Sequence, residues 1–237
     1  MELCIDTASD RAGVALSRQG TVVAELTWLC RANHSVELLP AIDQLLVRAG
    51  VERPELDVVF VCRGPGSYGG LRAGLSTATG LAFALKLQIL GLGRLELDAY
   101  QQTAFPGPIC AVHQAGRGEL GWALYQRYGE DWTELIAPRL SAPETLAAAV
   151  RAGVLFCGEI PQSLVEILRE QRGPETPIVT GNAAIRRPWA LAELGWRRFA
   201  KGDRDNPLYG EPIYLREPYI TVSNKTSGFS ASASPSA

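Results

Sequence analysis

The stretch Arg63-Gly-Pro-Gly-Ser-Tyr-Gly-Gly-Leu-Arg72 decides how this chain of 237 residues folds. It follows an apolar, β-branched run at 57–62, which predicts a buried strand. Residues 71–86 come after it, are rich in Ala, Leu and Thr without proline, and predict a helix. A glycine-rich turn from strand to helix can bring backbone N–H groups to an anion. The stretch therefore serves a ligand, a partner or the internal packing.

The predicted helix has one face made of small residues. Gly70, Gly74, Ala78 and Ala82 recur every four positions, so another helix could pack very close to this face. Gly74 is the central residue of this series. The spacing alone does not say whether the second helix belongs to this chain or to another.

The remaining pattern predicts two units of mixed α/β structure. In the first we expect strands at 2–6, 13–17, 21–28, 57–62 and 88–92 and helices at 35–49 and 71–86. The order β-β-β-α-β-α is typical of a ribonuclease-H-like or actin-like domain, with helices packed on a mixed sheet. In the second we expect strands at 109–114, 121–126, 132–136, 154–157 and 177–180 and helices at 143–152, 163–171 and 182–201.

These elements predict a division into two lobes and a tail. The first lobe spans 1–103 and is expected to be rejoined by about 203–222, and the second spans 104–202. Residues 223–237 are rich in Ser and Ala and cannot bury a core, so we expect them to be disordered.

Composition and charge exclude several classes of function. The formal net charge is −2, so no global basic field attracts nucleic acid. The five cysteines are scattered without a C-x-x-C pair, which favours a reducing compartment over a disulfide framework. The first residues are acidic where a signal peptide is basic, and no long uncharged apolar run could span a membrane. We expect a cytoplasmic protein.

Four segments in this order resemble the TsaB (YeaZ) family, whose members are accessory proteins of tRNA threonylcarbamoyladenosine biosynthesis. They are Leu3-Cys-Ile-Asp-Thr-Ala-Ser9, Asn33-His-Ser-Val-Glu-Leu-Leu-Pro40, Gly64-Pro-Gly-Ser-Tyr-Gly-Gly-Leu-Arg-Ala-Gly74 and Pro212-Ile-Tyr-Leu-Arg-Glu-Pro218. The resemblance extends to about Thr221 and is most specific in the glycine stretch. It implies a two-lobed fold of the actin/hexokinase/Hsp70 type.

The resemblance also implies a function without catalysis. It implies a partner of the threonylcarbamoyl transferase TsaD, required to modify the adenosine next to the anticodon in tRNAs, with the ATPase TsaE in the same assembly. It implies a homodimer when the protein is alone, and contact with tRNA only through the complex. In this family the two helices that follow the His-Ser motif and the glycine stretch form the dimer surface. The residues expected at the partner interface are Leu38, Ile42, Gly70, Leu71, Gly74, Leu75, Ala78 and Ala82.

Two departures from related patterns concern chemistry. The catalytic paralogue holds its metal through a His-x-x-x-His pair, whereas here His34 is followed at the second position by Leu38. We therefore expect no metal site and no catalysis. The second lobe's first hairpin in the family reads Asp-Ala-Arg-Arg-Gly-Glu, and here it reads Gln114-Ala-Gly-Arg-Gly-Glu119, so that an acid and one arginine are missing. Arg117 and Glu119 remain.

A nucleotide-binding or nucleotide-hydrolysing enzyme of the same superfamily is the alternative function. Its phosphate loop would consist of Asp6, Thr7, Ser9, Gly64 and Gly66. The Gly-Lys-Ser/Thr ending of a P-loop is replaced here by Gly70-Leu71-Arg72. The competing interpretation is that Asp6 caps its own turn and the glycines pack against a helix. We expect no cofactor, except a nucleotide at a partner interface if the alternative holds.

Two further interpretations have weaker support. A glycoprotease-like peptidase is disfavoured because the His-x-x-x-His pair is absent. Nucleophilic catalysis has no support either, since Ser67 lacks the Gly-x-Ser-x-Gly setting of a nucleophile elbow. Arg186-Arg187 and Arg197-Arg198, together with Trp189 and Trp196, could form a basic and aromatic surface for RNA. Arg and Trp also serve ordinary protein contacts, so direct tRNA binding is the less favoured reading.

Overall fold

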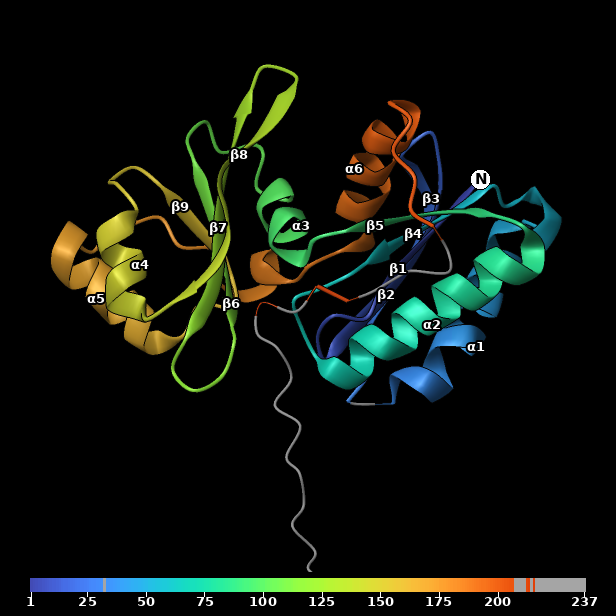
Figure 1. The fold of residues 1–237 in the computed structure, drawn as a ribbon, viewed down its shortest axis with the longest axis horizontal. Helices are drawn as coiled ribbons and strands as arrows, with labels where there is room; N and C mark the ends of the chain where they lie inside the picture. Colours follow the sequence, from blue (N-terminus) through green and yellow to red (C-terminus); the bar gives the residue numbers. More distant parts are fainter. Residues whose placement is uncertain (32, 207–211, 214, 216–237) are drawn as a thin grey trace, which may run out of the picture.

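Two mixed sheets organise the chain, one in each lobe (Figure 1). The computed structural model describes residues 1–31, 33–206, 212, 213 and 215. Figure 1 shows the first lobe around β1–β5 and the second around β6–β9, with a short helix, α3 (Arg94–Tyr100), between them. The fold predicted from the sequence, a two-lobed α/β protein with helices packed on mixed sheets, is confirmed.

The sheet of the first lobe has the strand order β3-β2-β1-β4-β5. Its strands are β1 (Glu2–Asp6), β2 (Arg11–Arg18), β3 (Thr21–Leu29), β4 (Val58–Cys62) and β5 (Gln88–Leu92). The first three form an antiparallel meander, while β4 and β5 continue parallel to β1. Every residue of β1 and β4 is buried, because helices cover both faces of this sheet.

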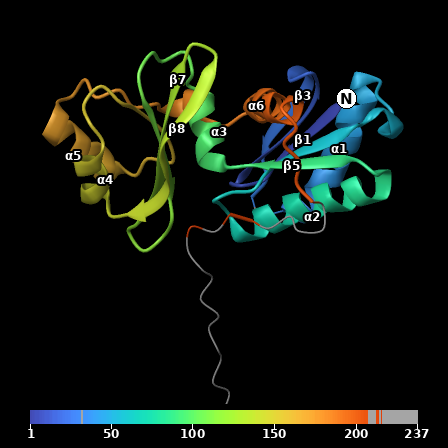
Figure 2. The ribbon, with the colours of Figure 1, turned by 45° about the horizontal axis from the view of Figure 1, so that its top comes forward.

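Three helices cover the first sheet. They are α1 (His34–Ala49), α2 (Tyr68–Leu85) and α6 (Pro188–Ala200). Figure 2 shows α1 and α2 on one side of the sheet and α6 on the other. One apolar cluster joins α1 and α2 to the sheet, and a second joins α6 to its opposite face. Burial of apolar surface on both faces stabilises the lobe.

The sheet of the second lobe has the order β8-β7-β6-β9. Its strands are β6 (Ile109–Gln114), β7 (Leu120–Tyr128), β8 (Asp131–Ser141) and β9 (Leu155–Gly158). The helices α4 (Pro143–Ala149) and α5 (Gln162–Arg172) pack on it. Two short 3₁₀ helices, η1 (Arg53–Glu55) and η2 (Gly181–Ala184), complete the described elements. No helix in the described part of the chain is long and apolar enough to cross a membrane.

The structure differs from the predicted elements in three places. Residues 177–180 form only an isolated bridge, from Ile178 to Phe156. The helix expected at 182–201 begins at Pro188 instead, because proline suits the first turn of a helix and not its interior. The helix α3 was not predicted from the sequence, since its seven residues are all buried and show no amphipathic pattern.

The boundaries of the two lobes remain a proposal. The predicted second lobe, 104–202, contains α6, which packs on the sheet of the first lobe. We therefore propose that the chain rejoins the first lobe from about Arg186 onward. The backbone of Asp205 pairs with that of Ile89 on β5, and the N–H of Ile213 donates to Arg63 O at 2.7 Å. The predicted tail, 223–237, and most of 207–222 lie outside the described residues.

Candidate functional site

The carboxylate of Asp6, at the end of β1, lies at the bottom of the cleft between the lobes. It is bound on both oxygens by the guanidinium of Arg186, with Nη2 at 3.0 Å from Oδ1 and Nε donating to Oδ2. The N–H of Ala8 also donates to Oδ1 at 3.0 Å. Asp6 therefore caps its own turn, as the competing interpretation predicted, and it also neutralises an arginine that is distant in the sequence.

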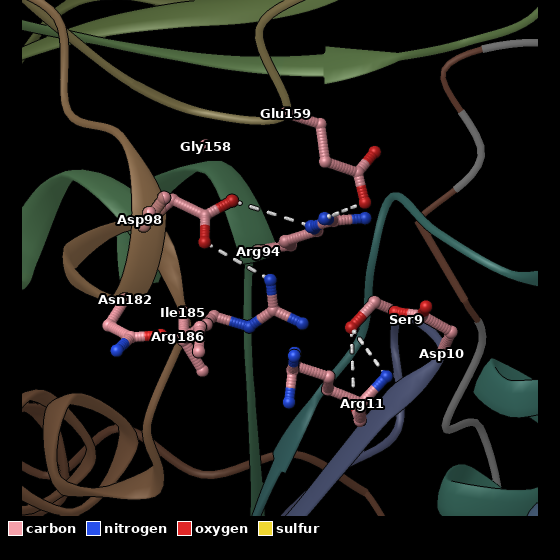
Figure 3. A pocket seen from close by; sticks show the side chains of 12 residues that line it. Ser9, Asp10, Arg11, Arg94, Asp98, Gly158, Glu159, Asn182, Ile185 and Arg186 are labelled. Carbon is pink, nitrogen blue, oxygen red and sulfur yellow. Dashed lines mark hydrogen bonds and ion pairs between the residues drawn. The ribbon is translucent and has the colours of Figure 1, made fainter. Parts of the chain in front are cut away.

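The buried helix α3 carries the next charged pair. Arg94 Nε lies 3.4 Å from Asp98 Oδ2, and Asp98 Oδ1 accepts from Arg186 Nη1 at 3.1 Å. The other nitrogens of Arg94 contact Ala8 O at 3.4 Å, His113 Nδ1 at 3.0 Å and the carboxylate of Glu159. Figure 3 shows Arg94 between Asp98 and Glu159, with Arg186 below them.

Burial and ion pairing shift the pKa values of the charged residues in this cleft in opposite directions. Burial acts to raise the pKa of Asp6, but the adjacent Arg186 outweighs it and keeps that pKa below its ordinary value. Burial likewise opposes ionisation of Glu159, while His113 and Arg94 lower its pKa. The pKa of Arg186 is raised because Asp6 and Asp98 outweigh the effect of its burial. All three groups are thus charged at neutral pH.

A cavity of about 420 Å³ opens beside these ion pairs. Residues of both lobes line it, among them Ser9, Arg11 and Asn182 (Figure 3). The guanidinium nitrogens of Arg94 and Arg186 are already bonded to protein oxygens or to His113. A phosphate entering the cavity would meet arginines that are already paired with carboxylates of the chain.

The residues of the predicted phosphate loop lie together but use their polar groups on one another. Thr7 Oγ1 donates to Gly70 O at 2.8 Å, and Ser9 exchanges hydrogen bonds with the backbone of Arg11. A Cβ atom at Gly66 would overlap the carbonyl of Ala8, whose oxygen accepts from the N–H of Ser67 at 2.9 Å. A Cβ at Gly64, whose φ is +96°, would meet Leu71 Cδ1 at 2.8 Å. The glycine stretch is thus packed against the β1–β2 turn.

The small-residue face of α2 is directed into the chain. There is no room for a Cβ atom at either glycine, because it would overlap Thr7 O at Gly70 and Thr7 Oγ1 at Gly74. The eight residues predicted at the partner interface are all buried within the chain: Leu38, Ile42, Gly70, Leu71, Gly74, Leu75, Ala78 and Ala82. That these residues meet a partner stays a prediction. They form the packing of α1 and α2 on each other and on the sheet.

The opposite face of the same helix pair is exposed and apolar. On α2 it comprises Gly69, Arg72, Ser76, Gly80, Phe83 and Ala84, whose spacing of three and four places them on one side of the helix. Phe83 is 76% exposed, and on α1 Val36 and Val47 are 71% and 81% exposed. A Cβ atom at Gly69 or Gly80 would meet nothing within 4 Å. We call these α2 residues, together with Val36, Leu39 and Val47, the outer helix face.

His34 and Leu38, the two positions compared with the metal-binding pair of the catalytic paralogue, have structural roles here. His34 is buried, with Nε2 at 2.9 Å from Ser9 O, and Leu38 lies in the core at 1% exposure. Among the residues that the structure describes, no three His, Cys, Asp or Glu side chains gather as they would around a metal ion. The five cysteines are all buried as free thiols.

The divergent hairpin and the basic clusters also have places in the fold. Gln114 ends β6, and Gly116, Arg117 and Gly118 make the turn into β7 with positive φ angles. The arginines of the predicted RNA surface are paired with carboxylates: Arg186 with Asp6 and Asp98, Arg187 with Glu25, Arg197 with Glu130 and Glu193, and Arg198 with Glu96. This pairing weakens the case for direct RNA binding.

Sequence reasoning missed the charged residues of the cleft. Arg94, Asp98, His113 and Glu159 were not singled out, and Arg186 was considered only as a surface cation. A signal was present at Arg94-Leu-Glu-Leu-Asp98, where an i,i+4 pair of opposite charges stands among leucines. The residues that pair with Arg94 and Asp98 come from distant segments, so only the folded chain shows them.

Comparisons with known proteins agree with this architecture. The chain matches the family model described as "TsaD: tRNA N6-adenosine threonylcarbamoyltransferase" over residues 16–156. It is 33% identical to the tRNA threonylcarbamoyladenosine biosynthesis protein TsaB of Bacillus subtilis, over 81% of this chain and 86% of that protein. It is 28% identical to the Escherichia coli protein of the same name, over 90% and 94%. The crystal structure of YeaZ from Pseudomonas aeruginosa shares the fold, with a TM-score of 0.76 at 24% identity over 90% and 99% of the two chains.

The two lobes, their mixed sheets and the cleft between them define a two-lobed α/β protein of the actin/hexokinase/Hsp70 type, built on a TsaD-like domain. Within that class, the identity and coverage of the relatives are specific. The chain belongs to the TsaB family.

Proposed function

We propose that this protein is a non-catalytic partner of a TsaD-type transferase and is required for threonylcarbamoyladenosine modification of tRNA. The observation that carries the proposal is the outer helix face. The helix pair exposes the apolar side chains of Phe83, Val36 and Val47, and apolar surface that a folded protein leaves uncovered can mark an interaction site. The names of the TsaB relatives support the same pathway.

The shape of this surface favours another helix pair as the ligand. Gly69, Ser76 and Gly80 leave a shallow strip along α2, along which a second helix can approach closely. Because the chain matches a TsaD family model over 16–156, a TsaD-type partner would present corresponding helices. Two similar helix pairs can then meet about a pseudo-twofold axis, as in an isologous dimer. The same face would support the homodimer of the isolated protein, and TsaE would join through the complex.

The cleft supports this non-catalytic role. Its arginines are bonded to carboxylates of the chain itself, so they are occupied before any substrate arrives. The nucleotide-binding alternative is favoured by the cavity of about 420 Å³ beside them. ATP turnover by the purified protein alone discriminates the two, and sustained turnover would favour the alternative.

Binding to a TsaD-type protein tests the proposal directly. Phe83→Asp places a charge on the outer helix face and should weaken binding at least about tenfold, as removal of a buried aromatic anchor does. Tyr128→Asp is the matched control, because Tyr128 is a 53% exposed aromatic on β7 in the other lobe. Titration calorimetry with both variants gives the comparison. Equal affinities for the two variants would place the interface elsewhere.

A further inference from the structure

The charged residues of the cleft form one continuous chain of contacts. It runs from Asp6 at the end of β1 to Arg186, then to Asp98 and Arg94 on α3, and ends at Glu159 and His113. His113 lies on β6 and Glu159 follows β9, so these two belong to the second lobe. We call these six residues the interlobe chain.

The interlobe chain crosses from lobe to lobe without a gap. Arg94 contacts Ala8 O of the first lobe at 3.4 Å and His113 Nδ1 of the second at 3.0 Å. His113 Nδ1 in turn lies 2.7 Å from Glu159 Oε2. Acidic and basic groups alternate along the chain, so each of the three carboxylates contacts at least one of the two arginines.

The central members of the interlobe chain are removed from water. The side chains of Arg94 and Asp98 are each 3% exposed, and those of Arg186 and Asp6 are 6% and 7% exposed. Buried charges that lose their partners are strongly penalised, although an intact buried pair adds little net stability. These ion pairs therefore add little to the free energy of folding. They strongly favour the one arrangement in which every buried charge keeps its partners.

These residues lie at the two connections between the lobes, so their pairing also restricts how the lobes lie relative to each other. Arg94 and Asp98 lie on α3, where the chain passes from the first lobe to the second, and Arg186 lies where it returns to α6 (Figure 1). The helix α3 packs on β6, β7 and β9 of the second lobe, whereas α6 packs on the sheet of the first lobe. A rotation that opens the cleft would therefore separate Asp98 from Arg186 and Arg94 from Ala8 O. Each separation removes one partner from a buried charge.

We propose that the interlobe chain is a latch, which holds the two lobes in one closed arrangement without a bound ligand. The two guanidinium groups are held in the cleft by three carboxylates of the protein itself. The relative position of the lobes is then independent of nucleotide, and the protein presents one rigid shape to its partners.

The distance between the lobes tests the latch. Spin labels on cysteines introduced at Arg18 on β2 and Glu170 on α5, both exposed, report that distance by double electron–electron resonance in the full chain. The five native thiols are buried and do not compete for the label. The unmodified latch should give one narrow distribution that saturating magnesium ATP does not change.

Arg186→Met removes the central cation and should broaden or shift this distribution. Amide exchange in α3 should rise on the order of a hundredfold, because local opening no longer unpairs Arg186. Arg187→Met is the matched control, since the neighbouring Arg187 forms an ion pair with Glu25 while 57% exposed. It should leave the distance and the exchange unchanged.

Glu159→Ala keeps the test decisive if Arg186→Met does not fold. Its side chain is 36% exposed, and the substitution removes one of the two second-lobe side chains that contact Arg94, leaving His113. It should also broaden the distribution. A single wild-type distance in every variant that folds, or a shift of the wild-type distance by ATP, would overturn the latch.

Discussion

Replacement of Arg186 by methionine gives the sharpest prediction about stability. Methionine fills a similar volume but leaves the carboxylates of Asp6 and Asp98 without their shared cation, and these residues are 5% and 4% exposed. Loss of one partner from a buried ion pair costs about 3–5 kcal/mol. Because a whole domain is stable by only about 5–15 kcal/mol, this one change should remove a large part of the free energy of unfolding.

Urea denaturation followed by tryptophan fluorescence measures this loss. With a slope of about 2–3 kcal/mol per molar urea, the midpoint should fall by about 1–2 M. Arg187→Met removes an ion pair between a 57% exposed arginine and the 14% exposed Glu25, so it should lower the free energy of unfolding less than Arg186→Met does. The triple variant Asp6→Asn, Asp98→Asn, Arg186→Met should recover part of the loss, since no buried charge remains unpaired. Midpoints for Arg186→Met and Arg187→Met that agree within error would refute the reasoning.

Three further predictions concern the helix pair and the cleft. Gly74→Leu should destabilise the fold by several kcal/mol, because its side chain would overlap Thr7, whereas Gly80→Leu points into open space and should leave the melting temperature unchanged but weaken partner binding. The opposite ranking in calorimetry would contradict this packing. Ser67→Ala removes the oxygen that accepts from the N–H of Gly70 and should lower stability by about 1 kcal/mol in urea titrations. The pKa values of Asp6 and Glu159 are lower in the folded chain, so their contribution is present above their unfolded values near pH 4 and is lost as the pH falls further. Glu159→Gln should flatten this acid loss, and an unchanged pH profile would contradict the assignment.

The regular parts of the fold could be predicted from the sequence because their patterns are local. The alternation of strands and helices, the glycine turn at 63–70 and the small residues along α2 are visible in short windows. Short windows of sequence do not show whether the small residues of α2 point into the chain or toward solvent. Gly74 faces Thr7 and Gly80 faces solvent, and only the packing of α2 on the β1–β2 turn distinguishes them.

The cleft required long-range information. Arg186 and Asp6 are separated by 180 residues, and nothing near either one identifies the other. The sequence did predict that Asp6 caps its own turn, which the bond from Ala8 N confirms. It could not predict that Arg94 on α3 and Arg186, just before α6, would lie in the same cleft.

Reconstitution of tRNA modification from purified components tests the central claim most directly. A TsaD-type transferase, a TsaE-type ATPase with ATP, tRNA and an activated threonylcarbamoyl donor should form threonylcarbamoyladenosine only when this protein is added. The Tyr128→Asp variant should restore the reaction and the Phe83→Asp variant should not, because only the latter alters the outer helix face. Modification at the full rate without this protein, or by this protein without the transferase, would contradict the account.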